Sequence, residues 1–270
     1  MTIRERWPLL DRRSVDDAPG ILRRDHYHLG YFDSPDLDLQ SSQARHVEEL
    51  CRQQSPSAGD IVVDVGCGLG NTARWIRQRF GSAVVGIDLL DVVLQKSRAL
   101  DDLPLAQGDM TRLPLRRSSV DLIVGIESLY GFPHRQVAFD EFGRALRPGG
   151  VMLLSEFILG DEADRLSTRV VSSVVHTNSL CPEAVYRSQL HDAGFVEISM
   201  IDVGEFTAVG TAAFLKSQAA LRRDLFAAQL GQPRGALFSM VGFPLFYKLW
   251  CDAFMTKRCR HVFVTARRRD

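Results

Sequence analysis

The sequence predicts an α/β fold in which helices cover both faces of a doubly wound, mostly parallel sheet. Short, continuous apolar runs alternate with helical patterns along the chain, as in sheets that are buried on both faces. The first run ends in a glycine-rich turn that leads directly into a helix. The second run ends at an acidic residue, and in such folds ligands bind at the carboxyl ends of the strands.

The first apolar run, Ile61–Val65, predicts a buried parallel strand. Gly66, Gly68 and Gly70 follow at every second position, and helical spacing begins at Thr72. Glycines in such a turn let backbone N–H groups come close to a ligand. A turn of this kind also fits a dinucleotide-binding dehydrogenase, so the glycines alone do not decide the ligand.

Asp64, two residues before Gly66, argues against a dinucleotide. A dinucleotide brings its pyrophosphate to the start of the helix, where a further carboxylate is unfavourable. A carboxylate at this place suits a ligand that carries an ammonium group.

The second apolar run, Ala83–Ile87, ends at Asp88. Asp88 lies about 20 residues past the glycines, the spacing at which an acid binds ribose hydroxyls in nucleotide-binding folds. A carboxylate accepts two hydroxyl donors at once, although an acid here could also simply end the strand.

The remaining elements follow in the order expected of the fold. Gln107–Met110 comes after a short apolar run, and the fourth strand, Val120–Ile126, leads into Glu127. A helix from His134 to Leu146 ends in a Pro-Gly-Gly turn before the fifth strand. The later elements are a helix over Glu183–Ala193, the strands Val151–Glu156, Phe195–Asp202 and His261–Arg267, and an early helix from Ser41.

The Asp-x-Gly-x-Gly-x-Gly pattern of residues 64–70 resembles motif I of the class I S-adenosylmethionine-dependent methyltransferases. The resemblance covers residues 60–157 directly, and the order of the later elements extends it to the carboxyl end. It implies a Rossmann-like, seven-stranded mixed sheet whose last strand is antiparallel, between the fifth and sixth, with helical lid insertions. It also implies S-adenosyl-L-methionine as cofactor and S-adenosyl-L-homocysteine as product.

The resemblance assigns roles to single residues. Asp88 would bind the ribose, Asp109 would receive the adenine amino group, and Met110 would pack on the ring. An aromatic segment at residues 25–33 is similar to the lid of small-molecule methyltransferases, in which a tyrosine reaches the methionine carboxylate of the cofactor. Each tyrosine there could equally be a packing residue. The complete cofactor-binding set is Tyr27, Tyr31, Asp64, Gly66, Cys67, Gly68, Asn71, Asp88, Leu89, Asp109, Met110 and Glu127.

We expect a single methyltransferase domain over residues 1–270. Its parts are an N-terminal lid segment (1–45), a cofactor-binding core (46–203), a substrate cap insertion (204–258) and the final strand (259–270). The cap is rich in aromatic residues, which predicts an apolar or aromatic substrate. The same side chains could instead pack into the core or form a homo-oligomer interface.

Methyl transfer depends mainly on alignment of the reactants and exclusion of water, so a catalytic set need not be obvious. A hydroxyl or carbon acceptor gains from a general base. His134 and Glu127, which follow the fourth strand, are candidates, and His176 is a weaker one. His134 could instead begin the next helix and face solvent. The cysteine and histidine spacing predicts no metal site.

The composition limits the partners. Lys+Arg and Asp+Glu are each 33, so no net charge attracts nucleic acid or a membrane surface. Five cysteines without paired spacing indicate free thiols and a cytoplasmic location. The most apolar late stretch, residues 235–250, is interrupted by Pro244 and Lys248 and is too short to span a bilayer.

The sequence therefore predicts a methyltransferase acting on the carbon, oxygen or nitrogen of a small apolar or aromatic molecule, as in natural-product biosynthesis. The alternative is a cyclase or other non-methylating enzyme that retains S-adenosylmethionine, because fold does not determine function. A nicotinamide dehydrogenase fits less well because of Asp64 and Asp109. A nucleic-acid or protein methyltransferase fits less well because the charge is balanced and no recognition module is visible.

Overall fold

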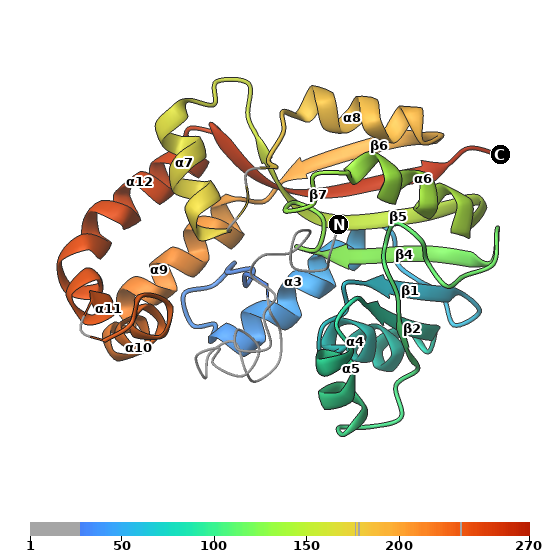
Figure 1. The fold of residues 1–270 in the computed structure, drawn as a ribbon, viewed down its shortest axis with the longest axis horizontal. Coiled ribbons are helices and arrows are strands. Elements are labelled where there is room, and N and C mark those ends of the chain that lie inside the picture. Colours follow the sequence, from blue (N-terminus) through green and yellow to red (C-terminus); the bar gives the residue numbers. More distant parts are fainter. Residues whose placement is uncertain (1–27, 176, 178, 233) are drawn as a thin grey trace.

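Seven strands form one sheet in the order β3-β2-β1-β4-β5-β7-β6 (Figure 1). The computed structural model describes residues 28–175, 177, 179–232 and 234–270. The strands are β1 Ile61–Val65, β2 Ala83–Asp88, β3 Leu105–Gln107, β4 Val120–Ile126, β5 Leu146–Leu159, β6 Phe195–Asp202 and β7 Cys259–Arg268. The helices packed around the sheet are α3 Leu39–Gln53, α4 Asn71–Phe80, α5 Asp91–Arg98, α6 Arg135–Ala145 and α8 Glu183–Asp192.

The sheet is parallel except for β7, which runs antiparallel to both of its neighbours, β5 and β6. The Rossmann-like, seven-stranded mixed sheet with an antiparallel last strand is thus confirmed. The chain moves outward from β1 to β2 and β3, then crosses back to place β4 on the other side of β1. The carboxyl ends of β1 and β4 therefore meet at the switch point where doubly wound folds bind ligands.

Alternate residues of the central strands build two separate cores. Val63 and Val65 pack with α6 and α8 on one face of the sheet. Val62 packs with α3 and α4 on the other face. Because both faces of the central strands are buried, these strands are continuous apolar runs in the sequence.

Several boundaries differ from the expected ones by a few residues, and those of β5 and α3 have a clear physical reason. β5 is longer than the expected Val151–Glu156, because β7 pairs with it as far as Leu159 and Leu146 pairs with β4. α3 begins before Ser41, because the Asp38 side chain accepts the Ser41 N–H at 2.7 Å and caps the helix.

Helices α7, α9, α10, α11 and α12 form an arm on one side of the sheet (Figure 1). Their bounds are α7 Arg165–Val174, η1 Glu205–Val209, α9 Gly210–Ser217, α10 Ala219–Leu230, α11 Arg234–Leu237, η2 Phe238–Gly242 and α12 Phe243–Met255, where η marks a short π-helical turn. The Trp250 indole donates to the Ala208 carbonyl at 2.8 Å, and Trp250 and Phe254 are buried against Phe157 of β5. This third core joins the arm to the carboxyl half of β5.

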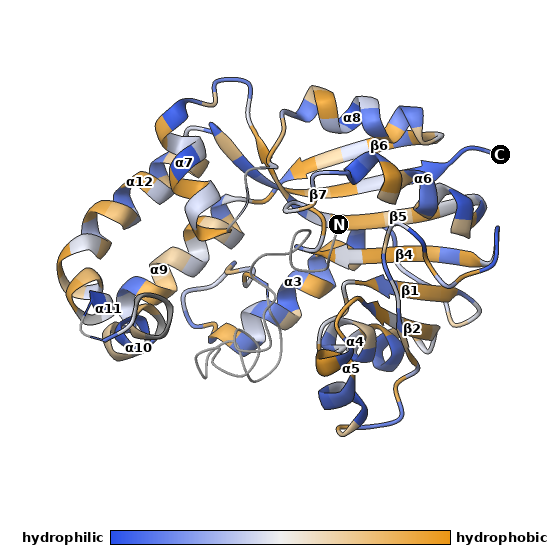
Figure 2. Cartoon of the chain, in the orientation of Figure 1, coloured by the Kyte–Doolittle hydropathy of each residue, from blue (hydrophilic) through white to orange (hydrophobic). Residues whose placement is uncertain are grey.

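Apolar residues occur along both the sheet and the arm (Figure 2). Many aromatic rings of the arm pack against one another, as Phe226 does against Phe238 and Phe246. Other large apolar side chains near the tip of the arm are exposed, namely Leu237, Met240, Val241 and Leu245. Across the described ranges, no helix combines the length and the apolar character that crossing a membrane requires.

The substitution Phe139→Ala should lower the free energy of unfolding by about 3–5 kcal/mol, because it leaves a cavity between α6 and α8. Phe139 is fully buried, and its ring lies 5.2 Å from that of Tyr186. Urea unfolding followed by circular dichroism measures the change. Val137→Ala on the same helix is the control, since Val137 is 47% exposed and should change stability little. Equal losses from the two variants would contradict this division of the core.

Candidate active site

The turn after β1 requires glycine. Gly66, Gly68 and Gly70 have φ values of 72°, 53° and 80°, in the left-handed region that other residues adopt at a cost. The N–H groups of Gly66 and Cys67 both donate to the Ile87 carbonyl, at 2.8 and 3.1 Å. The turn is therefore tied to the end of β2.

Asp88 holds this turn in place. One carboxylate oxygen accepts the Gly68 N–H at 2.9 Å, and the other accepts the Leu90 N–H at 2.9 Å. Burial raises the pKa of Asp88, while these backbone donors lower it. An ionised carboxylate has about four acceptor positions, so two hydroxyl donors of a ribose could still be accepted.

Asp64 is a buried carboxylate beside the same turn. It is 2% exposed, and its Oδ2 atom has no hydrogen-bond partner among the described residues. Burial raises the pKa of Asp64 to about 7, the negative charge of Asp88 adds to this, and the Ala73 N–H opposes it. A desolvated carboxylate of this kind is stabilised by a cationic ligand.

Ser128, just past β4, faces the turn from the other side of the switch point. A Cβ atom on Gly66 would lie 2.7 Å from the Ser128 Cβ, so only glycine fits there. The Ser128 hydroxyl is buried and, within the part of the chain that the structure describes, has no partner. The unpartnered atoms of Asp64 and Ser128 and the tight glycine turn together fit a ligand that bears an ammonium group.

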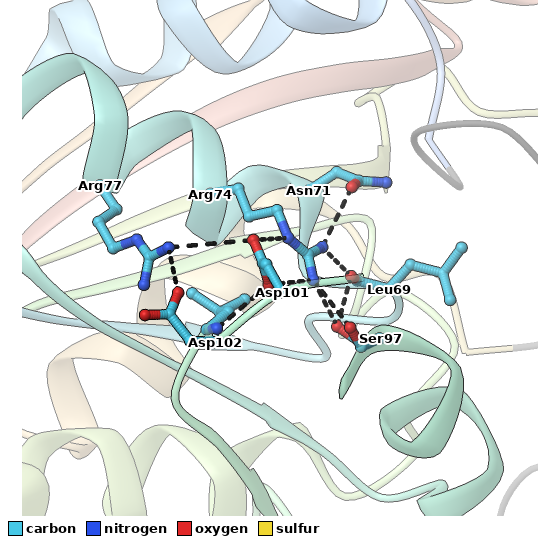
Figure 3. A network of polar contacts seen from close by, with 8 residues as sticks. Leu69, Asn71, Arg74, Arg77, Ser97, Asp101 and Asp102 are labelled. Atoms are coloured by element: carbon cyan, nitrogen blue, oxygen red, sulfur yellow. Dashed lines mark hydrogen bonds and ion pairs between the residues drawn. The ribbon is translucent and has the colours of Figure 1, made fainter. Parts of the chain in front are cut away.

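Arg74 of α4 ties the turn to its surroundings (Figure 3). Its guanidinium donates to both carboxylate oxygens of Asp101, to the Ser97 hydroxyl, and to the carbonyl oxygens of Leu69 and Ser97. Figure 3 shows these groups converging on Arg74 from the turn, α5 and the segment before β3. Sequence reasoning missed Arg74, because its partners Ser97 and Asp101 are distant in sequence and a lone arginine on a helix carries no local signal.

The segment proposed for adenine lies next to Asp88. The Gly108 N–H donates to the Asp88 carbonyl at 2.9 Å, and the Gln107 side chain donates to the Leu89 carbonyl at 3.1 Å. Asp109 accepts both the N–H and the hydroxyl of Thr111, which is the geometry of a turn residue. Met110 packs on the core of the α6 face. The structure thus brings Asp88, Leu89, Asp109 and Met110 together.

Cys67 has the properties of a packing residue. Its sulfur lies against Gly86 of β2, where an added Cβ atom would be 2.8 Å away. Burial raises the pKa of its thiol far above the usual range. Asn71 begins α4, and its side-chain oxygen accepts from Arg74 at 3.3 Å.

Glu127 lies at the carboxyl end of β4 and contacts the lid. Its backbone has a positive φ of 51°, and its Oε1 atom accepts the Leu29 N–H at 2.9 Å. Burial raises the pKa of Glu127 to about 8, and the charge of Glu156 adds to this. The described part of the lid, from His28 onward, therefore crosses the end of β4.

Three other candidates occupy different environments. Tyr31 stacks on Phe206, with ring centroids 4.8 Å apart. His134 is exposed at the N-cap of α6, where the solvent-facing alternative placed it. Tyr27 and His176 lie outside the described residues.

Sequence reasoning also missed a buried chain of polar side chains formed by His46, Ser155 and His261. His261 was assigned only to the last strand. No local pattern could have revealed the chain, because its members lie more than 100 residues apart along the sequence.

Comparison with known proteins identifies the family. A family model described as "Methyltransferase domain" matches residues 63–154. The Streptomyces halstedii protein "Methyltransferase GfsG" is 30% identical over 266 residues, which cover 93% of this chain and 91% of that protein. The chain belongs to the S-adenosylmethionine-dependent methyltransferases.

Two further comparisons agree with this assignment. The chain is 29% identical to the 27-O-demethylrifamycin SV methyltransferase of Amycolatopsis mediterranei, over 68% of this chain and 71% of that protein. The structure of a putative sarcosine dimethylglycine methyltransferase from Galdieria sulphuraria has the same fold, with a TM-score of 0.76 and 18% identity, covering 90% of this chain and 92% of that one.

The expected family, enzyme class and cofactor are therefore confirmed, and S-adenosylmethionine is the methyl donor. The assignment of single residues to the parts of the cofactor remains our proposal. Asp64 would hold the ammonium group, Asp88 the ribose, and Asp109 with Met110 the adenine.

The substitution Asp88→Asn should weaken binding of S-adenosylhomocysteine by at least about tenfold. The amide replaces one of the two acceptor oxygens with an NH₂ group, so the N–H of either Gly68 or Leu90 loses its acceptor. Isothermal titration calorimetry measures the affinity. Asp102→Asn is the matched control, since its side chain is 90% exposed and pairs with Arg77 on the surface. Equal affinities for Asp88→Asn and the parent enzyme would contradict the role of Asp88.

Cofactor affinity should fall as the pH drops below about 7. The pKa of Asp64 is raised to about 7, so below this pH the carboxyl is protonated and no longer attracts the ammonium group. The loss should approach about tenfold per pH unit. Titration of S-adenosylhomocysteine between about pH 5 and pH 8 measures it, with Asp64→Asn as the variant that lacks this dependence. A parent affinity that is constant over this range would contradict the prediction.

Proposed function

We propose that this methyltransferase transfers a methyl group to a hydroxyl oxygen of a bulky, largely apolar natural product. Similarity to two natural-product O-methyltransferases carries the proposal. One is the 27-O-demethylrifamycin SV methyltransferase, and the other is an erythromycin 3''-O-methyltransferase.

The arm supports an apolar acceptor. Its inner core contacts Tyr130, after β4, and Phe157, in β5, so the arm stands beside the carboxyl edge of the sheet. Pockets for small molecules are lined mainly by apolar and aromatic side chains. This packing supports the assignment of residues 204–258 as a substrate cap beside the cofactor site.

A hydroxyl acceptor must lose its proton while the oxygen–carbon bond forms. S-adenosylmethionine supplies a methyl group on a positively charged sulfur, so alignment of the acceptor with that methyl is the main requirement. The hydroxyl proton passes to a base of the protein, and a methyl ether and S-adenosylhomocysteine leave. Glu127 is the candidate base, because its buried carboxyl has a pKa raised to about 8, close to neutral pH.

Incubation with S-adenosylmethionine and natural products that offer a free hydroxyl, an amine or an activated carbon tests the acceptor class. We expect one equivalent of S-adenosylhomocysteine for each O-methylated product, identified by mass spectrometry and nuclear magnetic resonance. Methylation at nitrogen or carbon would contradict the proposed acceptor atom. Product formed without S-adenosylhomocysteine would instead indicate the cyclase alternative.

The substitution Glu127→Gln should lower kcat for the hydroxyl acceptor by about 10²–10⁴-fold, because it removes the proton acceptor and keeps the side-chain shape. His134→Gln tests the competing base. A larger loss from His134→Gln than from Glu127→Gln would contradict the assignment of Glu127.

A homo-oligomer and a cytoplasmic location are also part of the proposal. The exposed apolar side chains Leu237, Met240 and Val241 at the tip of the arm support contact between copies. The five cysteines are all free thiols, in keeping with a reducing compartment. Light scattering of the parent and a Met240→Lys variant tests the assembly, and a parent enzyme that is monomeric would contradict it.

A further inference from the structure

The backbone of one lid residue, Leu29, is held from two sides by buried side chains. The Leu29 N–H donates to Glu127 at 2.9 Å, and the Leu29 carbonyl accepts from His46 Nδ1 at 2.8 Å. Glu127 comes from the end of β4 and His46 from α3. The Gln43 side chain donates to the His28 carbonyl at 2.7 Å and adds a third contact from α3. The Leu29 carbonyl also accepts from His28 Nδ1 at 2.8 Å, so side chains of the lid and of the core together hold the lid over the switch point.

His46 also begins a chain of hydrogen bonds through the interior. Its Nε2 atom lies 2.9 Å from the Ser155 hydroxyl, which lies 3.1 Å from His261 Nε2. The Nδ1 atom of His261 lies 2.7 Å from the Thr207 hydroxyl, which donates to the Val203 carbonyl at 2.9 Å. The chain therefore links α3, β5, β7 and the π-helical turn η1.

This chain needs one proton more than its neutral members supply. Both ends are backbone carbonyls, Leu29 and Val203, which can only accept. The five hydrogen bonds each require a proton, whereas two neutral histidines, one serine and one threonine supply four. All five bonds can form together only when His46 or His261 is protonated on both nitrogens.

A carboxylate lies in position to balance that positive charge. Glu127 Oε1 is 3.5 Å from His261 Nε2. The other titratable groups that face the cluster are His28 from the lid, Tyr130 after β4 and Glu156 from β5. Burial lowers the pKa of His28 to about 4, so His28 is neutral.

Burial and hydrogen bonding act in opposite directions on the location of the extra proton. Burial lowers the pKa of His261 to about 3 and raises that of Glu127 to about 8. The carbonyl acceptors at both ends and the nearby carboxylate favour a charged imidazole instead. The hydrogen-bond count places the extra proton on an imidazole, with the Glu127 carboxylate as its partner, and groups coupled in this way titrate as a unit.

We propose that His46 is a positioning residue, which together with Glu127 clamps the backbone of Leu29 across the cofactor site. The clamp is complete only while the cluster of Glu127, His46 and His261 holds one proton more than its neutral histidines and ionised carboxylate supply. The proposal concerns cofactor binding and is independent of the acceptor. Loss of the proton opens one of the five hydrogen bonds, so cofactor affinity should decline as the pH rises.

The test is the affinity for S-adenosylhomocysteine, measured by calorimetry from neutral to alkaline pH. The parent enzyme should bind more weakly as the pH rises, because the cluster then loses its extra proton and one of the five hydrogen bonds opens. His46→Ala removes the contact with Leu29, so its affinity should be about tenfold weaker at neutral pH. Because the shortened chain no longer needs an extra proton, this variant should show no alkaline decline. His191→Ala on α8, where His191 is exposed, is the matched control and should behave as the parent.

Two further variants separate positioning from a general loss of structure. His46→Gln can still donate to the Leu29 carbonyl but cannot take up a proton, so it should recover affinity at neutral pH without the alkaline decline. Ser155→Ala breaks the chain but keeps the His46 contact with Leu29, so the decline should disappear with a smaller loss of affinity than in His46→Ala. Thermal unfolding shows whether each variant is folded.

Specific results would overturn the proposal. An alkaline decline that persists in both His46→Ala and Ser155→Ala, or its absence from the parent, would refute the shared proton.

Ligand atoms of His28, His46 and Glu127 lie within 4.8 Å of one another, but both nitrogens of His46 already have hydrogen-bond partners. An affinity that is lost with a chelator and restored by Zn²⁺ would instead show a metal site and contradict the clamp. Failure to methylate a hydroxyl would leave this test unaffected.

Discussion

The active site depends on the glycine turn after β1 and on the Asp88 carboxylate that holds it. The turn uses three positive φ angles in five residues, which only glycine adopts without strain. Two N–H groups of the turn bond to the end of β2, and Asp88 takes the N–H of Gly68. The Arg74 network then fixes the turn against α5 (Figure 3). These contacts fix the backbone N–H groups of the turn and the Asp88 carboxylate in the positions from which they would meet the cofactor.

The position of the site was predictable because its signals are local. Asp64, the glycines and Asp88 follow a fixed order along one strand–turn–helix–strand unit, and the bounds of β2, β4 and β6 follow from apolar runs. The antiparallel β7 was predictable from the family resemblance alone, since nothing within residues 259–268 encodes its direction.

The buried polar chain was not predictable because it is built from tertiary contacts. In the sequence, His46 is one residue of a predicted amphipathic helix and Ser155 is one residue of a predicted apolar strand, and neither pattern indicates that the two side chains meet. Only folding brings α3 against β5 and β7, where the two histidines share the Ser155 hydroxyl. The length of β5 was underestimated for a similar reason, because β7 pairs with residues beyond its apolar run.

Asp64 is the residue that most distinguishes this site from other nucleotide sites. Its carboxylate is buried without a partner for Oδ2 among the described residues, an arrangement that costs free energy until a cation is bound. A crystal structure of the complex with S-adenosylhomocysteine tests this account most directly. The account predicts that the ligand's ammonium group lies within hydrogen-bond distance of Asp64 and its ribose hydroxyls within that distance of Asp88. A bound ligand that contacts neither carboxylate would contradict it.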